Sequence, residues 1–185
     1  MGEIDDAIER ADREGFTRQP PKTLQARINF LMKQLKTTKA VAAELGISQR
    51  SVERYRKGER KHPPRAIAER IDAAVRQRWQ PQVRKRRQRQ AAARGGITVE
   101  TRARFGYTAP VGTTDDGRFR RLTVHLPPAY AQRLFDARNT DASDQHMRQI
   151  IAEGLKDIYF QDGGARAVGL SDVTLNDIDY LDLDY

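Results

Sequence analysis

Apolar residues recur at three- and four-residue steps through the first 80 positions, and this spacing predicts a series of amphipathic helices. A short charged helix over 3–15 is expected to pack on the helices that follow it or on a partner. A helix over 22–36 is expected to support the motif after it. Pro64 suits the first turn of a further helix, whose apolar face extends to about Trp79. The indole of Trp79 is expected to close this small core rather than to stack on a base.

The segment Thr38–Gly58 has the spacing of a helix-turn-helix. Three apolar residues ending at Leu45 share one face of a first helix, and Gly46 can adopt the left-handed conformation of a sharp turn. Ser48 is a good N-cap for a second helix, in which Val52 and a tyrosine repeat at helical spacing. The pattern therefore predicts two short helices joined by a tight turn.

The opposite face of that second helix carries residue types that read DNA grooves. Arginine can donate two hydrogen bonds to guanine and glutamine can pair with adenine, so Gln49, Arg50 and Arg54 are the first candidates for base contacts. The full set of candidate DNA contacts in this region is Ser48, Gln49, Arg50, Ser51, Glu53, Arg54, Lys57, Arg60 and Lys61. The alternative is a plain helical hairpin with a solvated basic face.

The second half of the chain begins with a different period. Residues 97–107 alternate apolar and polar side chains, as a β-strand does, and residues 119–126 repeat that alternation after a turn-rich loop. Pro127 and Pro128 then begin an amphipathic helix, and Ser143 caps another. The pattern predicts two strands followed by two helices.

The strand and two helices in RRLTVHLPPAYAQRLFDARNTDASDQHMRQIIAEGLKDIYF resemble the ribbon-helix-helix dimers. Pairing of this strand with its copy in a second chain would satisfy its backbone hydrogen bonds and bury its apolar face. In that family the outward strand residues enter the major groove, so Arg121, Thr123 and His125 are secondary candidates for DNA contact or for the interface. Pairing with residues 97–107 of the same chain is an equal alternative.

Charge divides the chain into two halves. Residues 1–94 contain 24 Lys and Arg against 11 Asp and Glu, residues 95–185 contain 10 against 14, and the whole chain carries a net charge of +9. The basic half is therefore expected to bind a polyanion through its phosphates. Residues 81–96 are too densely basic to be buried and predict a helical or flexible arm along DNA, with a solvated linker as the alternative. The arm's candidate phosphate contacts are Arg84, Lys85, Arg86, Arg87 and Arg89.

The expected fold class is mostly α with a smaller α+β part. We expect a helical DNA-binding region over 1–80, a basic arm over 81–96, a strand-rich module over 97–162 and an acidic tail over 163–185. Because aspartates alternate with apolar residues in the tail, it is expected to be extended and partly disordered. It would fold back on the basic arm, dock on a basic partner or only add solubility.

Several kinds of site are excluded by the residues present. Cysteine is absent, which excludes disulfides and thiolate metal sites and is compatible with a reducing cytosol. No apolar run approaches the roughly 20 residues of a membrane span, and the N-terminus is unlike a signal peptide, so a cytoplasmic, nucleoid-associated protein is expected. His62, His125 and His146 lack the spacing of metal ligands. Asp115 and Asp116 are expected to mark a charged turn rather than a magnesium site.

Across essentially its whole length the chain resembles the telomere-protecting terminal proteins of linear actinomycete chromosomes and plasmids. The resemblance is clearest in LMKQLKTTKAVAAELGISQRSVERYRKG, in ITVETRARFGYTAPVGTTDDGRFRRLTVHLPP and in the acidic tail. It implies a protein joined covalently to the 5′ end of linear DNA through a hydroxyl that primes synthesis across the terminal gap. The family's priming threonine corresponds to Thr114. The partners implied are the telomeric 5′ end and 3′ overhang, a telomere-associated protein and a DNA polymerase.

The residue types of this chain are compatible with protein-primed DNA synthesis but do not by themselves require it. A glycine-bounded loop can offer an adaptable hydroxyl, and the Mg²⁺ ions of the partner polymerase can activate that hydroxyl, so the chain needs no cofactor or catalytic site of its own. Thr113 is the adjacent alternative, and Tyr107 and Thr108 are chemically possible. A dimeric transcriptional or partition regulator without covalent attachment is the second interpretation. A nuclease or ligase that uses Asp115 and Asp116 is the third.

Overall fold

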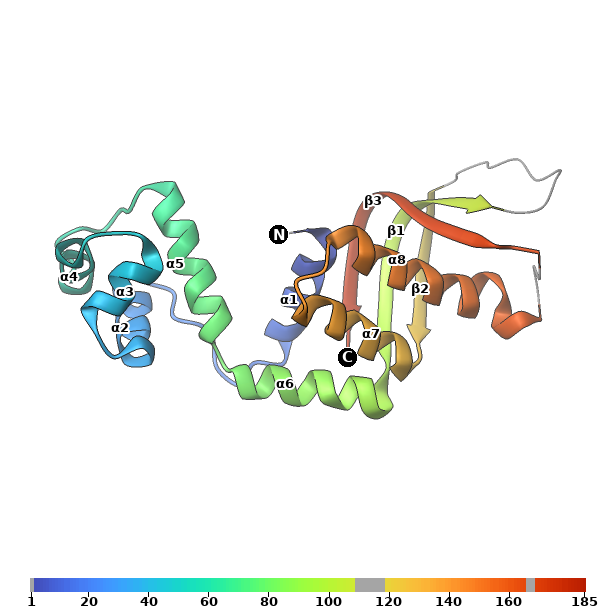
Figure 1. Cartoon of the computed structure of the whole chain (residues 1–185), viewed down its shortest axis with the longest axis horizontal. Helices are drawn as coiled ribbons and strands as arrows, with labels where there is room; N and C mark the ends of the chain where they lie inside the picture. The colour runs from blue at the N-terminus through green and yellow to red at the C-terminus, as the bar shows by residue number, and fades with distance from the viewer. Residues whose placement is uncertain (1, 109–118, 166–168) are drawn as a thin grey trace. The chain divides into compact units, whose positions relative to one another are not determined.

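The computed structural model describes residues 2–108, 119–165 and 169–185, which divide into two compact units. One unit is Phe16–Gln82. The other combines the segment ending at Gly15 with Val83–Tyr185, so the first unit is an insertion in the sequence of the second. The fold is mostly helical with a small antiparallel sheet, as the sequence predicts (Figure 1). No helix in the described ranges combines the length and the apolar content needed to cross a membrane.

The inserted unit consists of four helices around one small core. They are α2 (Leu24–Leu35), α3 (Thr38–Leu45), α4 (Gln49–Lys57) and α5 (Arg65–Arg78). The hydroxyls of Thr23, Thr37 and Ser48 each accept a hydrogen bond from the backbone N–H three residues later, which caps the first three helices. The apolar positions at helical spacing are buried together, so the predicted helices are confirmed. Trp79 packs edge-on against Phe30, with 5.0 Å between ring centroids.

The second unit is built on a three-stranded antiparallel sheet with the strand order β2-β1-β3. Its strands are β1 (Ile97–Thr108), β2 (Phe119–Leu126) and β3 (Asp172–Asp184). Three helices, α1 (Glu3–Glu14), α7 (Pro128–Asn139) and α8 (Asp144–Leu155), lie on one side of this sheet (Figure 1). Alternate strand residues pack with them in a single core, which leaves the opposite side of the sheet open to solvent. We call that side the open face.

The two predicted strands pair with each other within the chain. Ile97 lies opposite Leu126 and Arg104 lies opposite Phe119 in an antiparallel ladder. Of the two pairings that the sequence allows, the structure has the intramolecular one. After β2, helices α7 and α8 follow in the predicted order, and α8 continues into a π-helical turn over Lys156–Phe160 and a short 3₁₀ turn over Asp162–Gly164.

The prediction of a flexible acidic tail is wrong. Residues Asp172–Asp184 form β3, which pairs with β1 and buries apolar side chains at both of its ends, including Val173 and Leu183. The register shifts on β1 between Arg102 and Phe105, so the alternation along β3 is interrupted in its middle. Because most of the aspartates point to solvent from the positions between the buried ones, the sheet accommodates them without burying charge.

The prediction that the first helix packs on the following helices is also wrong. Ile4, Ala7, Ile8 and Ala11 of α1 are buried in the core of the sheet unit, so the first 80 residues do not form one structural region. An amphipathic stripe specifies which face of a helix is buried, but it does not specify which surface covers that face.

The basic arm is helical, as one alternative predicts, but not all of its cations face solvent. It forms α6 (Pro81–Gln90), which continues as a π-helical turn over Ala91–Gly95. Arg84 NH2 lies 2.9 Å from Glu9 Oε1, and Arg87 NH1 donates to the carbonyl oxygen of Ala11 at 2.7 Å. The expectation that this segment is too basic to be buried is therefore wrong for Arg84 and Arg87, because α1 supplies carboxylate and carbonyl oxygens that compensate them.

Candidate nucleic-acid interface

Helix α4 presents a continuous polar surface to solvent. Val52 and Tyr55 are buried in the core, which fixes the rotation of the helix about its own axis. The side chains of Gln49, Arg50, Glu53, Arg54 and Lys57 are consequently exposed. The structure thus brings the candidates for base contact together on one outward face.

The charge of this surface is strongly positive. Between Arg50 and Arg65 the sequence has seven Lys and Arg against two Glu. The ion pairs are long and exposed: Arg54 Nε is 3.8 Å and Lys57 Nζ is 4.0 Å from the carboxylate of Glu59. Such pairs contribute about 0–1 kcal/mol each, so phosphate oxygens can replace the carboxylate at little cost.

The connection between α3 and α4 is held from both sides. Gly46 ends α3 with φ 61° and ψ 40°, a left-handed conformation that glycine adopts without strain. Arg70 of α5 donates to the carbonyl oxygen of Leu45 at 3.0 Å, and a Cβ atom at position 46 would lie 2.5 Å from the same Arg70 nitrogen. The hydroxyl of Ser48 caps α4 and lies 2.9 Å from the Ser51 hydroxyl. Both serines therefore have a structural role at the start of α4.

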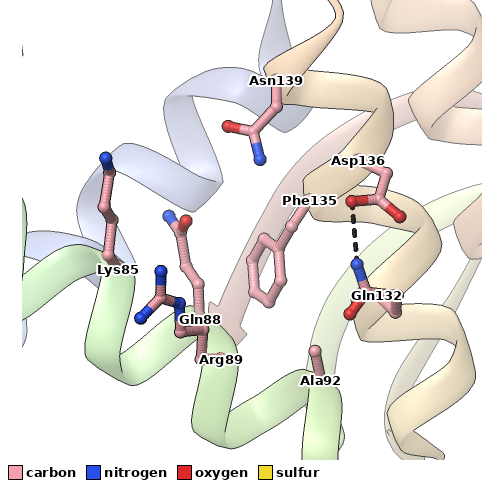
Figure 2. Close-up of a pocket in the computed structure, with 8 residues that line it drawn as sticks. All are labelled: Lys85, Gln88, Arg89, Ala92, Gln132, Phe135, Asp136 and Asn139. Atoms are coloured by element: carbon pink, nitrogen blue, oxygen red, sulfur yellow. Dashed lines mark hydrogen bonds between the residues drawn. The ribbon is translucent and has the colours of Figure 1, made fainter.

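Three cations of α6, Lys85, Arg86 and Arg89, remain exposed. Two of them border a hollow of about 200 Å³ between α6 and α7 (Figure 2). Gln88 and Ala92 line the α6 side of this hollow with them, whereas its α7 side is formed by Gln132, Phe135, Asp136 and Asn139. Two cations four positions apart on one helix can hold one phosphate group, although Asp136 on the opposite side opposes an anion there.

The secondary candidates Arg121, Thr123 and His125 all point to solvent from the open face of the sheet. Thr98 Oγ1 lies 3.2 Å from His125 Nδ1. The remaining open-face residues opposite or beside these three are Thr98, Glu100, Arg102 and Arg104 from β1, Phe119 from β2, and Tyr180, Asp182 and Asp184 from β3.

Glu100 connects the three strands across the open face. Its carboxylate accepts hydrogen bonds from Arg121 NH2 at 2.7 Å and from the Tyr180 hydroxyl at 3.1 Å. The hydrogen bond from Arg121 has the larger effect and that from Tyr180 the smaller, and together they hold the pKa of Glu100 below its ordinary value. The hydrogen bond to Glu100 raises the pKa of the Arg121 guanidinium. The face therefore carries fixed charges of both signs at neutral pH.

A buried network of charges that was not expected from the sequence joins α1 to α7. Arg138 contacts three carboxylates of α1: Asp5 at 2.7 Å, Asp12 at 3.1 Å and Glu9 at 3.4 Å. Burial lowers the pKa of the Arg138 guanidinium, but the hydrogen bonds and charges of Asp5 and Asp12 outweigh it and leave that pKa raised. The spacing of the three acids on one helical face was the signal in the sequence.

Tyr185 completes the same network. Its hydroxyl donates to Asp12 Oδ1 at 2.7 Å, and its ring packs edge-on against Phe135 with 5.0 Å between centroids. Burial, followed by the charge of Asp12, raises the pKa of the Tyr185 phenol well above its ordinary value. Arg87 lies over the Tyr185 ring at 5.2 Å and donates to its carbonyl oxygen. These contacts fasten the end of β3 to α1, α6 and α7.

The predicted priming residue Thr114 and its neighbours Thr113, Asp115 and Asp116 lie outside the described residues. Tyr107, by contrast, is partly buried and packs on Phe160 with 5.1 Å between ring centroids.

Most of the predicted DNA contacts fall on three surfaces: α4 with its N-cap Ser48, the outward face of α6 and the open face of the sheet. Arg60 and Lys61 are exposed in the segment that follows α4, whereas Arg84 and Arg87 contact α1. The α4 surface and the open face belong to different units. Within the part of the chain that the structure describes, no three His, Cys, Asp or Glu side chains are grouped as a metal site. Comparisons with models of protein families, with curated proteins and with solved structures found no match to this chain.

Proposed function

We propose that this chain binds duplex DNA through α3 and α4, acting as a helix-turn-helix with α4 as the helix that enters the major groove. The observation that carries the proposal is the exposed cationic face of α4, whose orientation is fixed by the buried Val52 and Tyr55. Arg50, Arg54 and Gln49 are the side chains proposed to reach base edges. The exposed cations of α6 contact phosphates and add to the affinity.

The sheet unit is proposed to form a homodimer. The order of β2, α7 and α8 supports a relation to the ribbon-helix-helix dimers, although here β1 already pairs with one side of β2. No described strand pairs with the other side of β2, where the strand of a second copy can add. In such a dimer Arg121, Thr123 and His125 remain on the exposed side of the enlarged sheet.

We further propose, from the resemblance to the telomere-protecting terminal proteins, that the bound DNA is the end of a linear replicon in the nucleoid. The Thr114 hydroxyl oxygen attacks the α-phosphorus of a deoxynucleoside triphosphate, pyrophosphate leaves, and the hydroxyl proton passes to the surrounding solvent. The Mg²⁺ ions of the partner DNA polymerase support this step, and the attached nucleotide's 3′-hydroxyl is then extended. A telomere-associated protein that binds the 3′ overhang is the other proposed partner.

Intact-mass measurement tests the covalent part of this proposal. Protein purified from cells under denaturing conditions and digested with nuclease is expected to keep the mass of at least one nucleotide. A dimeric transcriptional or partition regulator binds DNA without a covalent bond, so it would show the mass of the unmodified chain. If protein recovered from replicon ends shows the mass of the unmodified chain and no other, it is not a terminal protein.

The double variant Arg50→Ala/Arg54→Ala tests the α4 surface. Each lost contact to a base is expected to cost about 1–3 kcal/mol of duplex binding, and each lost phosphate contact lowers the salt slope of log K by about 0.9. Titration of duplex DNA by fluorescence anisotropy at several salt concentrations measures both quantities. Lys22→Ala/Lys33→Ala, which removes two exposed cations from α2 and the segment just before it, is the matched control and should leave affinity within twofold. Equal weakening by the control would mean that net charge alone explains binding.

A further inference from the structure

The end of the open face nearest Phe119 differs from the opposite end. In the β1–β2 ladder, Arg104 lies opposite Phe119 and Arg102 lies opposite Arg121, so each outward side chain there is an arginine or an aromatic ring. Tyr180 lies opposite Arg102 on the other neighbouring strand. We call these five residues the Phe119 cluster.

The Phe119 side chain is exposed and belongs to neither hydrophobic core. Its relative exposure is 47%, and within the described residues Tyr159 is the other large apolar side chain left exposed. The guanidinium carbons of Arg102 and Arg104 lie 5.6 and 5.3 Å from the centroid of the Phe119 ring, and that of Arg121 lies 6.0 Å from the Tyr180 ring. The cluster therefore offers a half-exposed ring with two guanidiniums over it.

The arginines of the cluster are also held by carboxylates. Arg102 NH1 lies 2.5 Å from Asp179, and Arg104 NH1 lies 3.5 Å from Asp177. All four side chains are about half exposed or more, so phosphate oxygens can replace the carboxylates at little cost. While Arg102 and Arg104 are paired with these carboxylates, both guanidiniums lie over the Phe119 ring, and their transfer to phosphates would free the ring for a base.

The balance of charge indicates which nucleic acid this surface fits. The three arginines of the cluster face three carboxylates, so attraction to phosphates alone is weak here. Affinity must then come from the ring, which can stack only on a base whose own face is free. In a duplex the neighbouring base pairs cover those faces, whereas in a single strand they are accessible.

We propose that the Phe119 cluster binds single-stranded DNA by stacking an unpaired base on Phe119, with Arg102 and Arg104 exchanging their carboxylates for the flanking phosphates. The inference rests on the proposed function in placing this chain at a DNA end, where single strands occur. If Thr114 carries the 5′ end, Phe119 follows the attachment residue by five positions in the sequence.

Binding of a fluorescently labelled 15-nucleotide oligothymidylate to the purified, DNA-free chain tests the proposal. Phe119→Ala is expected to weaken binding at least fivefold, because stacking of a base on an aromatic ring supplies most of the affinity. Tyr159→Ala, which removes the other exposed large apolar side chain of the described residues and lies outside the open face, is the matched control and should bind within twofold of the wild type. Duplex affinity, which the proposed function assigns to α4, should not change in either variant.

Phe119→Trp supplies a second readout that does not depend on loss of function. The variant is expected to bind at least as tightly as the wild type, and the emission it adds to that of Trp79 should be quenched by the oligonucleotide as a base stacks on the indole. Absence of binding by the wild type, unchanged affinity of Phe119→Ala or an unquenched Phe119→Trp variant would each overturn the proposal. None of these results bears on covalent attachment, which the mass measurement tests separately.

Discussion

Replacing Thr114 with alanine is expected to reduce nucleotide attachment to the background level, because alanine has no hydroxyl to attack the α-phosphorus. The protein is incubated with the partner polymerase, a telomeric template and a labelled deoxynucleotide. The measurement is the amount of label that stays attached to the protein under denaturing conditions. Thr114→Ser keeps a hydroxyl and should retain part of the labelling. Duplex affinity should stay at the wild-type level, since the surface proposed to bind duplex is on α4.

The neighbouring threonine provides the control for position. Thr113→Ala makes the same chemical change one residue away and is expected to leave labelling within about twofold of the wild type. Normal labelling of Thr114→Ala together with loss in Thr113→Ala would move the acceptor by one residue. Normal labelling of both single variants and of the double variant would remove this pair of hydroxyls from the mechanism.

Arg138→Ala is expected to lower the free energy of unfolding of the sheet unit by about 3 kcal/mol. The variant leaves Asp5, Glu9 and Asp12 close together without their shared cation, and removing one partner of a buried ion pair typically costs 3–5 kcal/mol. The lower end of that range applies because Asp12 keeps its hydrogen bonds from Gln88 and Tyr185. Urea unfolding followed by circular dichroism measures the change.

Arg133→Ala is the matched control because it removes an arginine from the same helix. Arg133 pairs with Glu153 at 2.5 Å, but its side chain is 47% exposed, so the loss should stay below about 1 kcal/mol. Equal losses in the two variants would show that the contacts of Arg138 with α1 add nothing beyond those of an exposed pair.

The helices were predictable because their signals are local. Thr37 and Ser48 cap the helices that they precede, and Gly46 ends α3 in the conformation that the turn requires. The strand period of residues 97–107 and 119–126 was equally visible. The pairing of these strands could not be chosen from that period, because the alternation is the same for a partner in the same chain and in a second chain.

The wrong predictions concern contacts between distant parts of the sequence. The tail has apolar residues at alternate positions near both ends, including Val173 and Leu183, but the aspartates between them made a disordered peptide the simpler interpretation. The interruption in the middle of β3 also hides its period. For α1, the acidic face that contacts Arg138 has the composition of an ordinary solvated surface. Its partner Arg138 lies far along the chain, so the contact is visible only in the folded structure.

The candidate DNA contacts were predicted unevenly for the same reason. The outward face of α4 follows from the positions of Val52 and Tyr55 alone. For the arm, a run of cations gave no indication that Arg84 and Arg87 would be taken up by contacts with α1. The Phe119 cluster is assembled from all three strands, so it becomes visible only with the register of the sheet.

The insertion of Phe16–Gln82 within the other unit has a consequence for the order in which the protein can fold during synthesis. The four inserted helices are synthesised before β1, and their core contains no residue from outside the insertion. Helix α1 is translated before the insertion, yet its core partner β3 is translated after both β1 and β2. The apolar side of α1 therefore has to wait for its native cover while the insertion and the two other strands are synthesised.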